Sequence, residues 1–174
     1  MRHSPRVLRF LFATVAVTAA IAAPASAAHH AKDGMARGVL SEINAVRQAH
    51  GLRPLRPIRP LGAAAGQHSN EMGTRGYFSH DSADGTSFWK RVGRYYGSTG
   101  YRYWSVGENL LWSSGSLTPT AAVNMWMNSP PHRKNLLDPN WRQVGLSVKR
   151  FTDAPGVFHG LAVTIVTADF GTRY

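Results

Sequence analysis

Apolar residues recur at three- and four-residue spacing in several parts of the chain, which is the spacing of one face of an α-helix. In chain order the predicted helices are residues 33–51, 60–76, 86–97 and 118–129. Asp33 and Thr118 are the expected N-caps of the first and last helices, because their side-chain oxygens can accept a main-chain N–H. Gly51 is expected to end the first helix, and the Pro130–Pro131 pair the last.

Towards the C-terminus the pattern changes to strict alternation, which is typical of β-strands. Val144, Leu146 and Val148 alternate with other residues in the segment 143–151, and "TDAPG" then predicts a turn before a second strand at 157–171. A short extended piece is also expected at 106–112, inside an otherwise loop-like stretch. Helices first and an antiparallel hairpin last predict an α+β domain with helices packed on the faces of a small sheet.

The first residues of the chain have the pattern of a secretory signal peptide. Arg2, Arg6 and Arg9 are followed by an apolar run over residues 10–23 and by Ala25-Ser26-Ala27, a small-residue cleavage signal. The run is shorter than the roughly 20 residues that a membrane span needs. We therefore expect a signal peptide at 1–27, an N-terminal tail at 28–37 and one domain at 38–174. The mature protein is expected to be secreted and monomeric, with no membrane span.

The amino-acid composition excludes some kinds of site and favours others. The chain has no cysteine, which excludes disulfides, cysteine zinc sites and a thiol nucleophile. It carries 20 Lys and Arg against 9 Asp and Glu, so its surface attracts anions such as an envelope polymer, a lipid head group or an anionic glycan. The basic residues are scattered and no recognition motif accompanies them, which favours a solvated face over a specific nucleic-acid site.

Six short segments occur in an order and at intervals that resemble a known family. They are "INAVRQAHGLRPL", "QHSNEM", "GYFSHDSADG", "VGENLLW", "WMNSPPHRKNLL" and "VGLSV". Together they resemble the CAP superfamily of cysteine-rich secretory proteins, antigen 5 and pathogenesis-related 1 proteins, in its disulfide-free bacterial branch with an SCP-like extracellular domain. The resemblance covers about residues 38–172. It implies a three-layer α-β-α sandwich with a small, mainly antiparallel central sheet.

The resemblance also implies a cleft lined by two histidines and two glutamates, in which the histidines can hold a divalent metal. His80 matches the first histidine and Glu108 matches one glutamate. The position of the second glutamate is Ser129 here, and the closest match to the second histidine is Asn140. His132 is the characteristic histidine of the bacterial branch and is expected to reach the cleft from a neighbouring turn.

His80, His132 and Glu108 form a set that suits zinc, because neutral imidazole and carboxylate are ligands of catalytic zinc sites. The three residues lie in separate segments and lack the spacing of a helical zinc motif. Structural roles therefore stay open: His80 can bond the turn at 81–85, Glu108 can orient loop amides, and His132 can interact with a helix end. His68 is interpreted as part of a surface network with Glu71 and Arg75.

Aromatic residues flank Glu108 in "RYYGSTGYRYWSVGENLLW". Tyr103 and Trp104 are predicted on the rim of the cleft, where their faces suit sugars or lipids, although packing between helices and sheet is an equal alternative. Trp89 and Trp126 are assigned to the core. No "GxSxG" elbow is present, which argues against a serine hydrolase.

Three functions follow from these observations. The favoured one is a secreted module that binds a lipid, glycan or envelope component in the cleft, with a divalent cation such as zinc as a candidate cofactor. The second is a metal-dependent extracellular hydrolase that uses His80, His132 and Glu108. The third is a module for protein partners or signalling. The loss of the second glutamate favours binding over catalysis.

Overall fold

The computed structural model describes residues 25–174, with side chains from residue 34 onward. In chain order the elements are α1 (Ala25–Ala49), β1 (Arg56–Pro57), α2 (Arg59–Arg75), α3 (Phe88–Gly93), β2 (Trp104–Ser113), α4 (Pro119–Asn128), α5 (Pro130–Leu136), β3 (Gln143–Ala154), a 3-10 turn (Gly156–Phe158) and β4 (Leu161–Arg173). The strands form one sheet in the order β1-β3-β4-β2. The β3–β4 and β2–β4 pairs are antiparallel, and the two residues of β1 pair with β3 in parallel.

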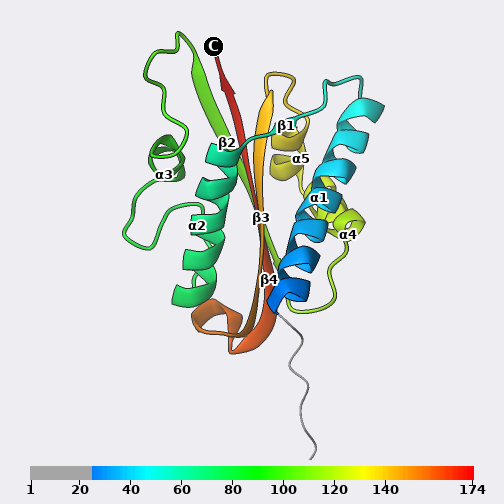
Figure 1. Ribbon diagram of the computed structural model, residues 1–174, viewed down its shortest axis with the longest axis vertical. Helices are drawn as coiled ribbons and strands as arrows, with labels where there is room; N and C mark the ends of the chain where they lie inside the picture. Colours follow the sequence, from blue (N-terminus) through cyan, green and yellow to red (C-terminus); the bar gives the residue numbers. More distant parts are fainter. Residues whose placement is uncertain (1–24) are drawn as a thin grey trace, which may run out of the picture.

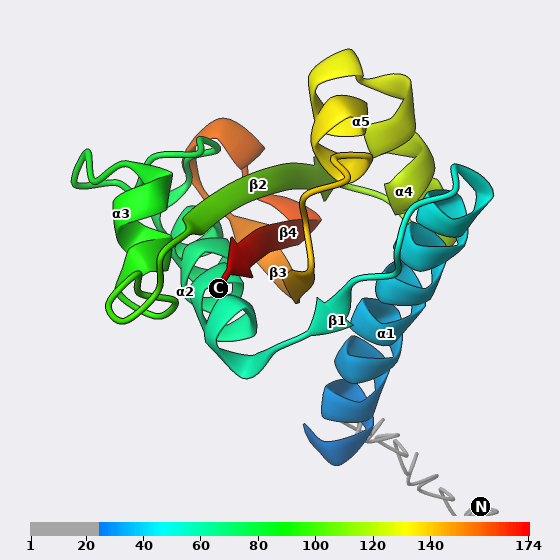
Figure 2. The ribbon, with the colours of Figure 1, turned by 90° about the horizontal axis from the view of Figure 1, so that it is seen from above.

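The elements form three layers. Helices α2 and α3 cover one face of the sheet, and α1, α4 and α5 cover the other (Figures 1 and 2). The predicted α-β-α sandwich with a mainly antiparallel sheet is therefore confirmed. Because strand side chains alternate between faces, β3 and β4 contribute to both cores.

The larger core lies between the sheet and α1, α4 and α5. Val144, Val166 and Phe170 from the strands meet Ile43 of α1 and Trp126 of α4, and all of these side chains are buried. Trp126 also donates its indole N–H to the carbonyl of Leu110, 3.1 Å away. This contact ties α4 to β2 and fixes the wall of the site described below.

Helix α2 packs against the sheet at backbone contact. A Cβ atom at Gly145 of β3 would collide with the main chain of Leu61 and Gly62, and one at Gly73 would collide with the ring of Phe151. Both glycines are buried. The helix ends at Gly76, whose φ of 72° is in the left-handed region that favours glycine. Gly73 therefore serves close packing, and only Gly76 forms the helix end.

Several boundaries differ from the sequence prediction. Helix α1 begins at Ala25, so Asp33 lies inside it and the expected tail at 28–37 is helical. Strand β2 runs over ten residues, where only a short extended piece was expected. Pro130 begins α5, a helix that the sequence did not predict, because proline suits a first helical turn as well as a helix end. The Thr118 cap is confirmed, with its side chain accepting the N–H of Ala121.

The sequence analysis assigned Trp89 to the interior and His68 to the surface, and both assignments were wrong. Trp89 is 48% exposed and lies outside the core. His68 is completely buried, and its Nε2 lies 2.8 Å from the carbonyl of Ser79, so it belongs to no surface network. The Glu71–Arg75 pair does form, at 3.8 Å. The predicted leader lies largely outside the described residues, and among the helices that are described none is long and apolar enough to cross a membrane.

Candidate functional site

Glu108 lies in the middle of β2 with its side chain fully buried, and both of its carboxylate oxygens are engaged. Oε1 lies 2.8 Å from Nδ1 of His80, and Oε2 forms an ion pair with the guanidinium of Arg91 in α3. Arg91 also donates to the carbonyl of His80 at 2.8 Å. One arginine therefore holds both the carboxylate and the loop that carries the histidine.

This arrangement fixes the chemistry of His80. Its Nδ1 faces a carboxylate oxygen, which can only accept, so Nδ1 carries the hydrogen and Nε2 is left as an acceptor in the neutral ring. The side chain of His80 is 50% exposed, although its partner Glu108 is buried. The site thus presents one oriented imidazole to solvent.

A second buried carboxyl group lies beside Glu108. Asp169 of β4 is the direct cross-strand partner of Glu108, and among the described residues neither of its oxygens meets a donor group. Burial, and then the adjacent charge of Glu108, raise the pKa of Asp169 well above its ordinary value. The raised pKa favours the protonated form of Asp169, which can donate a hydrogen bond to Glu108. The guanidinium of Arg91 pairs with Glu108, and no ion pair of Asp169 is found among the described side chains.

His132 lies on the first turn of α5, on the same cleft but without contact to Glu108. Its Nδ1 lies 2.9 Å from the hydroxyl oxygen of Ser129, which precedes the helix. Burial, and then the charge of His80, lower the pKa of His132. The imidazole is therefore neutral near pH 7. Ser129 occupies the predicted position on the rim, where it replaces a carboxylate with a hydroxyl group.

Two asparagines connect α5 to β2. The Asn135 side chain donates to the carbonyl of Glu108 at 3.1 Å and lies 2.9 Å from Oδ1 of Asn109. Asn109 in turn donates to the carbonyl of His132 at 3.0 Å. These neutral hydrogen bonds fix the position of His132 relative to Glu108. Because neighbouring residues of a strand point to opposite faces, the side chain of Asn109 points away from that of Glu108. Its amide group bonds to His132 and Asn135 of α5 and so holds this helix against β2.

Beside these residues lies a groove of about 290 Å³. It is lined mainly by apolar side chains, with Ser129 and His132 as its polar members; the full set is Phe78, Leu110, Leu111, Trp112, Met125, Trp126, Ser129 and His132. Phe78 and Met125 are exposed although both are large and apolar. Exposed apolar side chains around a hollow are typical of a ligand or partner site. We refer to this set as the imidazole groove.

The predicted zinc site does not match this geometry. The two oxygens of Glu108 already bond to His80 and Arg91, so Glu108 is not free to be a third ligand. Within the part of the chain whose side chains are described, no group of three His, Asp or Glu side chains is arranged to hold a metal ion. The imidazoles of His80 and His132 remain, and two ligands are fewer than the three of a catalytic zinc site.

Three residues expected on the rim lie elsewhere. Tyr103 stacks on Tyr174 with ring centroids 5.0 Å apart, and Trp104 donates its indole N–H to the carbonyl of Tyr96 at 2.7 Å. Asn140 follows α5, and its carbonyl accepts from Thr172 at 2.6 Å. Trp104 begins β2 and Tyr103 directly precedes it. Because a strand is extended, both residues lie far from Glu108 although they are close to it in the sequence.

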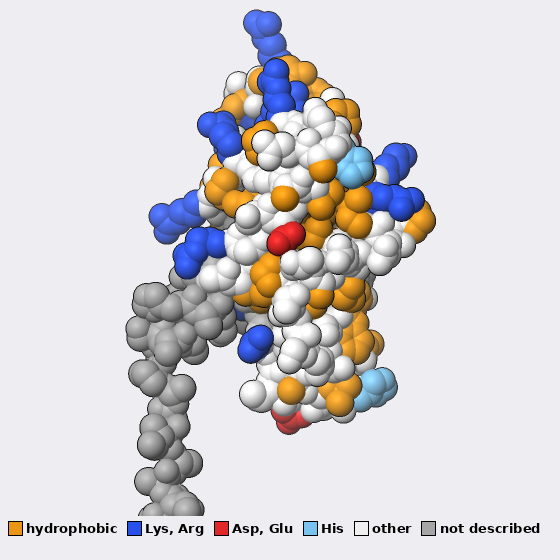
Figure 3. Space-filling model, turned by 90° about the vertical axis from the view of Figure 1, so that its right-hand side faces the viewer, with side chains coloured by type: hydrophobic (Ala, Val, Ile, Leu, Met, Phe, Trp, Pro, Cys, Tyr) orange, Lys and Arg blue, Asp and Glu red, His pale blue; other side chains and the backbone are white. Residues whose placement is uncertain are grey.

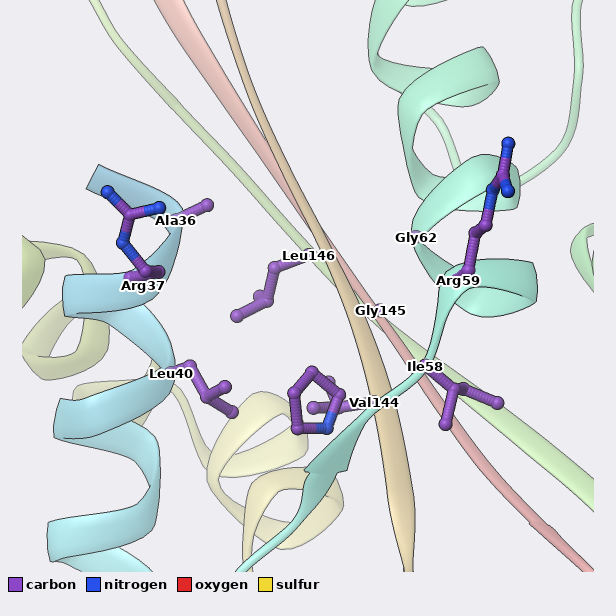
Figure 4. Close-up of a pocket in the computed structure, with 10 residues that line it drawn as sticks. Ala36, Arg37, Leu40, Ile58, Arg59, Gly62, Val144, Gly145 and Leu146 are labelled. Atoms are coloured by element: carbon purple, nitrogen blue, oxygen red, sulfur yellow. The ribbon is translucent and has the colours of Figure 1, made fainter. Parts of the chain in front are cut away.

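A second hollow, of about 320 Å³, lies between α1 and the junction of β1 and α2. Leu40, Val144 and Leu146 point into it, while Arg37 projects from α1 and Arg59 from α2 on opposite sides (Figure 4). It shares no lining residue with the imidazole groove. Both of these arginines are exposed.

Comparison with known proteins identifies relatives of this arrangement. The family model described as the cysteine-rich secretory protein family (CAP) matches residues 40–170. The chain is 36% identical over 108 residues to the uncharacterized protein YkwD of Bacillus subtilis, covering 62% of this chain and 40% of that protein. It is 32% identical over 112 residues to the uncharacterized membrane protein YlbC of the same organism, covering 64% and 31%. The chain thus spans less than half the length of these curated relatives.

Solved structures of bacterial proteins share the fold of this chain. An extracellular protein containing an SCP domain from Bacillus anthracis superposes with a TM-score of 0.64 at 26% identity, over 86% of this chain and 44% of that one. An outer surface protein from Borrelia burgdorferi (TM-score 0.59, 23% identity, 78% and 90% covered) and a cysteine-rich secretory protein from Staphylococcus aureus (0.59, 18%, 80% and 38%) share the fold. From the match over residues 40–170, the chain belongs to the cysteine-rich secretory protein family, CAP.

Proposed function

We propose that this chain is an exported CAP domain that binds an amphiphilic ligand, a lipid or a glycoside, in the imidazole groove. The observation that carries the proposal is an apolar hollow of about 290 Å³ that is lined by the imidazole of His132, whose Nδ1 lies 2.9 Å from the hydroxyl oxygen of Ser129. Apolar walls with a few fixed polar groups are the usual composition of small-molecule sites. Phe78, Trp112 and Met125 would contact the apolar part of the ligand, and His132 its hydroxyl or ester groups.

Export is part of the same proposal. It is supported by the signal-peptide pattern at 1–27 and by relatives described as extracellular and outer-surface proteins. Pulse-labelling of the full chain in a bacterial host is expected to release a shortened protein, cleaved after Ala27, into the medium or envelope fraction. Retention of the uncleaved chain in the cytoplasm would contradict it.

Binding can be tested with octyl glucoside, which combines an alkyl chain with a sugar, kept below its micelle concentration. The informative variant is Met125→Lys, which places a charge on the groove wall at a side chain that is 45% exposed, so that folding is little affected. Val157→Lys is its matched control, because Val157 is 49% exposed and lies in the 3-10 turn outside the groove. We expect calorimetric binding to be lost in Met125→Lys and kept in Val157→Lys. Equal affinity in both variants would refute the groove.

The metal-dependent hydrolase stays the alternative, and zinc calorimetry on the full chain decides it. The titration should use a His29→Ala/His30→Ala background, because these two histidines are a chelating pair of their own in the sequence. One-to-one zinc binding that His80→Ala and His132→Ala each abolish would support a metal centre. Because Glu108 is engaged by Arg91, we expect no tight site.

A further inference from the structure

Four arginines surround a third hollow, of about 560 Å³. Its lining includes Arg173 at the end of β4, the end of the chain that is marked C in Figure 1. Strand pairing brings the four arginines together from distant parts of the sequence. Arg56 of β1 pairs with Gln143, Arg142 precedes β3 and donates its main-chain N–H to Gly171, and Arg173 ends β4. Arg53 enters from the segment after α1. We call this set the arginine hollow.

Two of the four guanidinium groups are held in place by the fold. Nη1 of Arg142 donates to the carbonyl oxygens of Pro139 and Trp141, at 2.6 and 3.0 Å. Nη1 of Arg173 donates to the carbonyl of Gly97 at 2.9 Å, and its guanidinium carbon lies 4.0 and 4.5 Å from the ring centroids of Tyr96 and Tyr101. Cations fixed in this way lose little freedom when an anion binds.

The other two, Arg53 and Arg56, are exposed, and the described residues give their side chains no hydrogen-bond or ion-pair partner. No Asp or Glu lines the hollow, and the ion pairs found among the described side chains involve Glu71 and Glu108 elsewhere. Tyr174 also lines the hollow, and its main-chain oxygen is already bonded to the amides of Arg102 and Tyr103. Like charges gathered around a concave site repel one another and attract an anion.

We propose that the arginine hollow binds a linear phosphate polymer, of the kind in which phosphodiesters join small polyol or sugar units. Guanidinium forks match phosphate oxygens in paired hydrogen bonds, and the volume admits more than one phosphate group. The excess of Lys and Arg over Asp and Glu, visible as scattered blue side chains and few red ones in Figure 3, attracts such a chain from a distance. The proposal does not rest on the imidazole groove, because the two sites share no lining residue.

The aromatic residues nearby favour a polymer without bases over a nucleic acid. Single-stranded nucleic acids bind through free aromatic faces on which bases stack. Here the rings of Tyr96 and Tyr101 face Arg173, and Tyr174 stacks one face on Tyr103. Tyr174 is 71% exposed, so the hollow offers a base the open face of this ring rather than a row of free rings for successive bases. The hollow is also concave, and its rim lacks the cluster of exposed aliphatic side chains that would enter a membrane.

The test is a calorimetric titration of the full chain with inorganic tripolyphosphate at low ionic strength. The variant Arg53→Gln/Arg56→Gln removes the two unpartnered cations, and Arg37→Gln/Arg59→Gln removes the same charge from the exposed arginines of the second hollow. We expect one-to-one binding that weakens by at least about tenfold in the first variant, since each charge-assisted hydrogen bond to phosphate is worth more than a neutral one. The control should lose about twofold or less. Matching thermal unfolding curves for all three proteins verify that the substitutions leave the fold intact.

Two further titrations separate the sources of phosphate. Vesicles of phosphatidylglycerol present phosphates on a membrane, and an oligothymidylate presents them with bases. The proposal expects tripolyphosphate to bind with a clear dependence on Arg53 and Arg56, and both other probes to bind with less dependence on these residues. No binding of tripolyphosphate, equal weakening in the two variants, or a stronger dependence with vesicles or oligothymidylate would each overturn it.

Discussion

Replacing Asp169 with asparagine should change how the stability of the protein depends on pH. Asp169 is completely buried beside Glu108, and burial followed by the charge of Glu108 raises the pKa of its carboxyl group. In the unfolded chain the same group has an ordinary pKa of about 4. The asparagine side chain in Asp169→Asn would be the neutral counterpart of the protonated carboxyl group and could still donate to Glu108.

The direction of the pH dependence follows from whether the folded or the unfolded state keeps the proton of Asp169. Below pH ~4 the carboxyl is protonated in both states, so it adds no pH dependence to the stability. As the pH rises above this value, the unfolded chain loses the proton while the folded protein keeps it. Wild-type protein therefore loses stability relative to Asp169→Asn by about 1.4 kcal/mol per pH unit, until the raised pKa of the folded state is reached. Because Glu108 and Asp169 are adjacent, this proton belongs to the pair.

The assay is urea unfolding of both proteins at half-unit steps between pH 4 and 8. Its readout is the difference between the two stability curves as a function of pH, so a constant packing cost of the amide does not matter. Asp153→Asn, in which an exposed carboxyl is replaced, corrects for the general effect of removing a negative charge from a basic protein. If the curves of wild type and Asp169→Asn run parallel after this correction, Asp169 is ionised in the folded protein and the reasoning is wrong.

Three further variants probe the interior. Arg91→Met should cost about 3–5 kcal/mol in urea unfolding, because it leaves the buried carboxylate of Glu108 without its ion-pair partner; a loss below ~1 kcal/mol would contradict this role. Burial lowers the pKa of His68, so the free energy of unfolding of the wild type should decrease as the pH falls below ~6.5. His68→Gln should reduce this pH dependence, and an unchanged slope of the unfolding free energy against pH would contradict it. Gly145→Ala should cost at least about 2 kcal/mol, against little for the exposed Gly115→Ala, because its Cβ meets the backbone of α2.

Much of the architecture could be predicted from local signals. The Thr118 cap, the helical spacing of apolar residues in α2 and the alternation in β3 each determine their element through nearby residues. Strand β2 was underestimated because Glu108 and Asn109 interrupt its apolar pattern. Glu108 pairs with Arg91 of α3, and Asn109 bonds to Asn135 of α5. The pattern of residues within the strand gives no information about these partners from other elements.

The site was predicted in part for the same reason. His80 and Glu108 were found through a resemblance, and they do meet at 2.8 Å. Arg91 and Asp169 were missed because each lies in a helix or strand that could be predicted without giving that residue a role. Arg91 is one of the basic residues of α3, and Asp169 lies in β4. Only the pairing of β2 with β4, and the packing of α3 beside them, reveals that both enclose the same carboxylate. An arginine and an aspartate inside predicted elements are the signal that sequence reasoning had available.

The most direct test of the proposed function is to map where octyl glucoside binds, by following backbone amide and methyl NMR signals of the uniformly labelled protein. We predict that the largest shifts fall on Phe78, Trp112, Met125 and His132, which line the imidazole groove. Shifts centred instead on Leu40 and Leu146, in the hollow between α1 and β3, would contradict the account, as would the absence of any localised shifts.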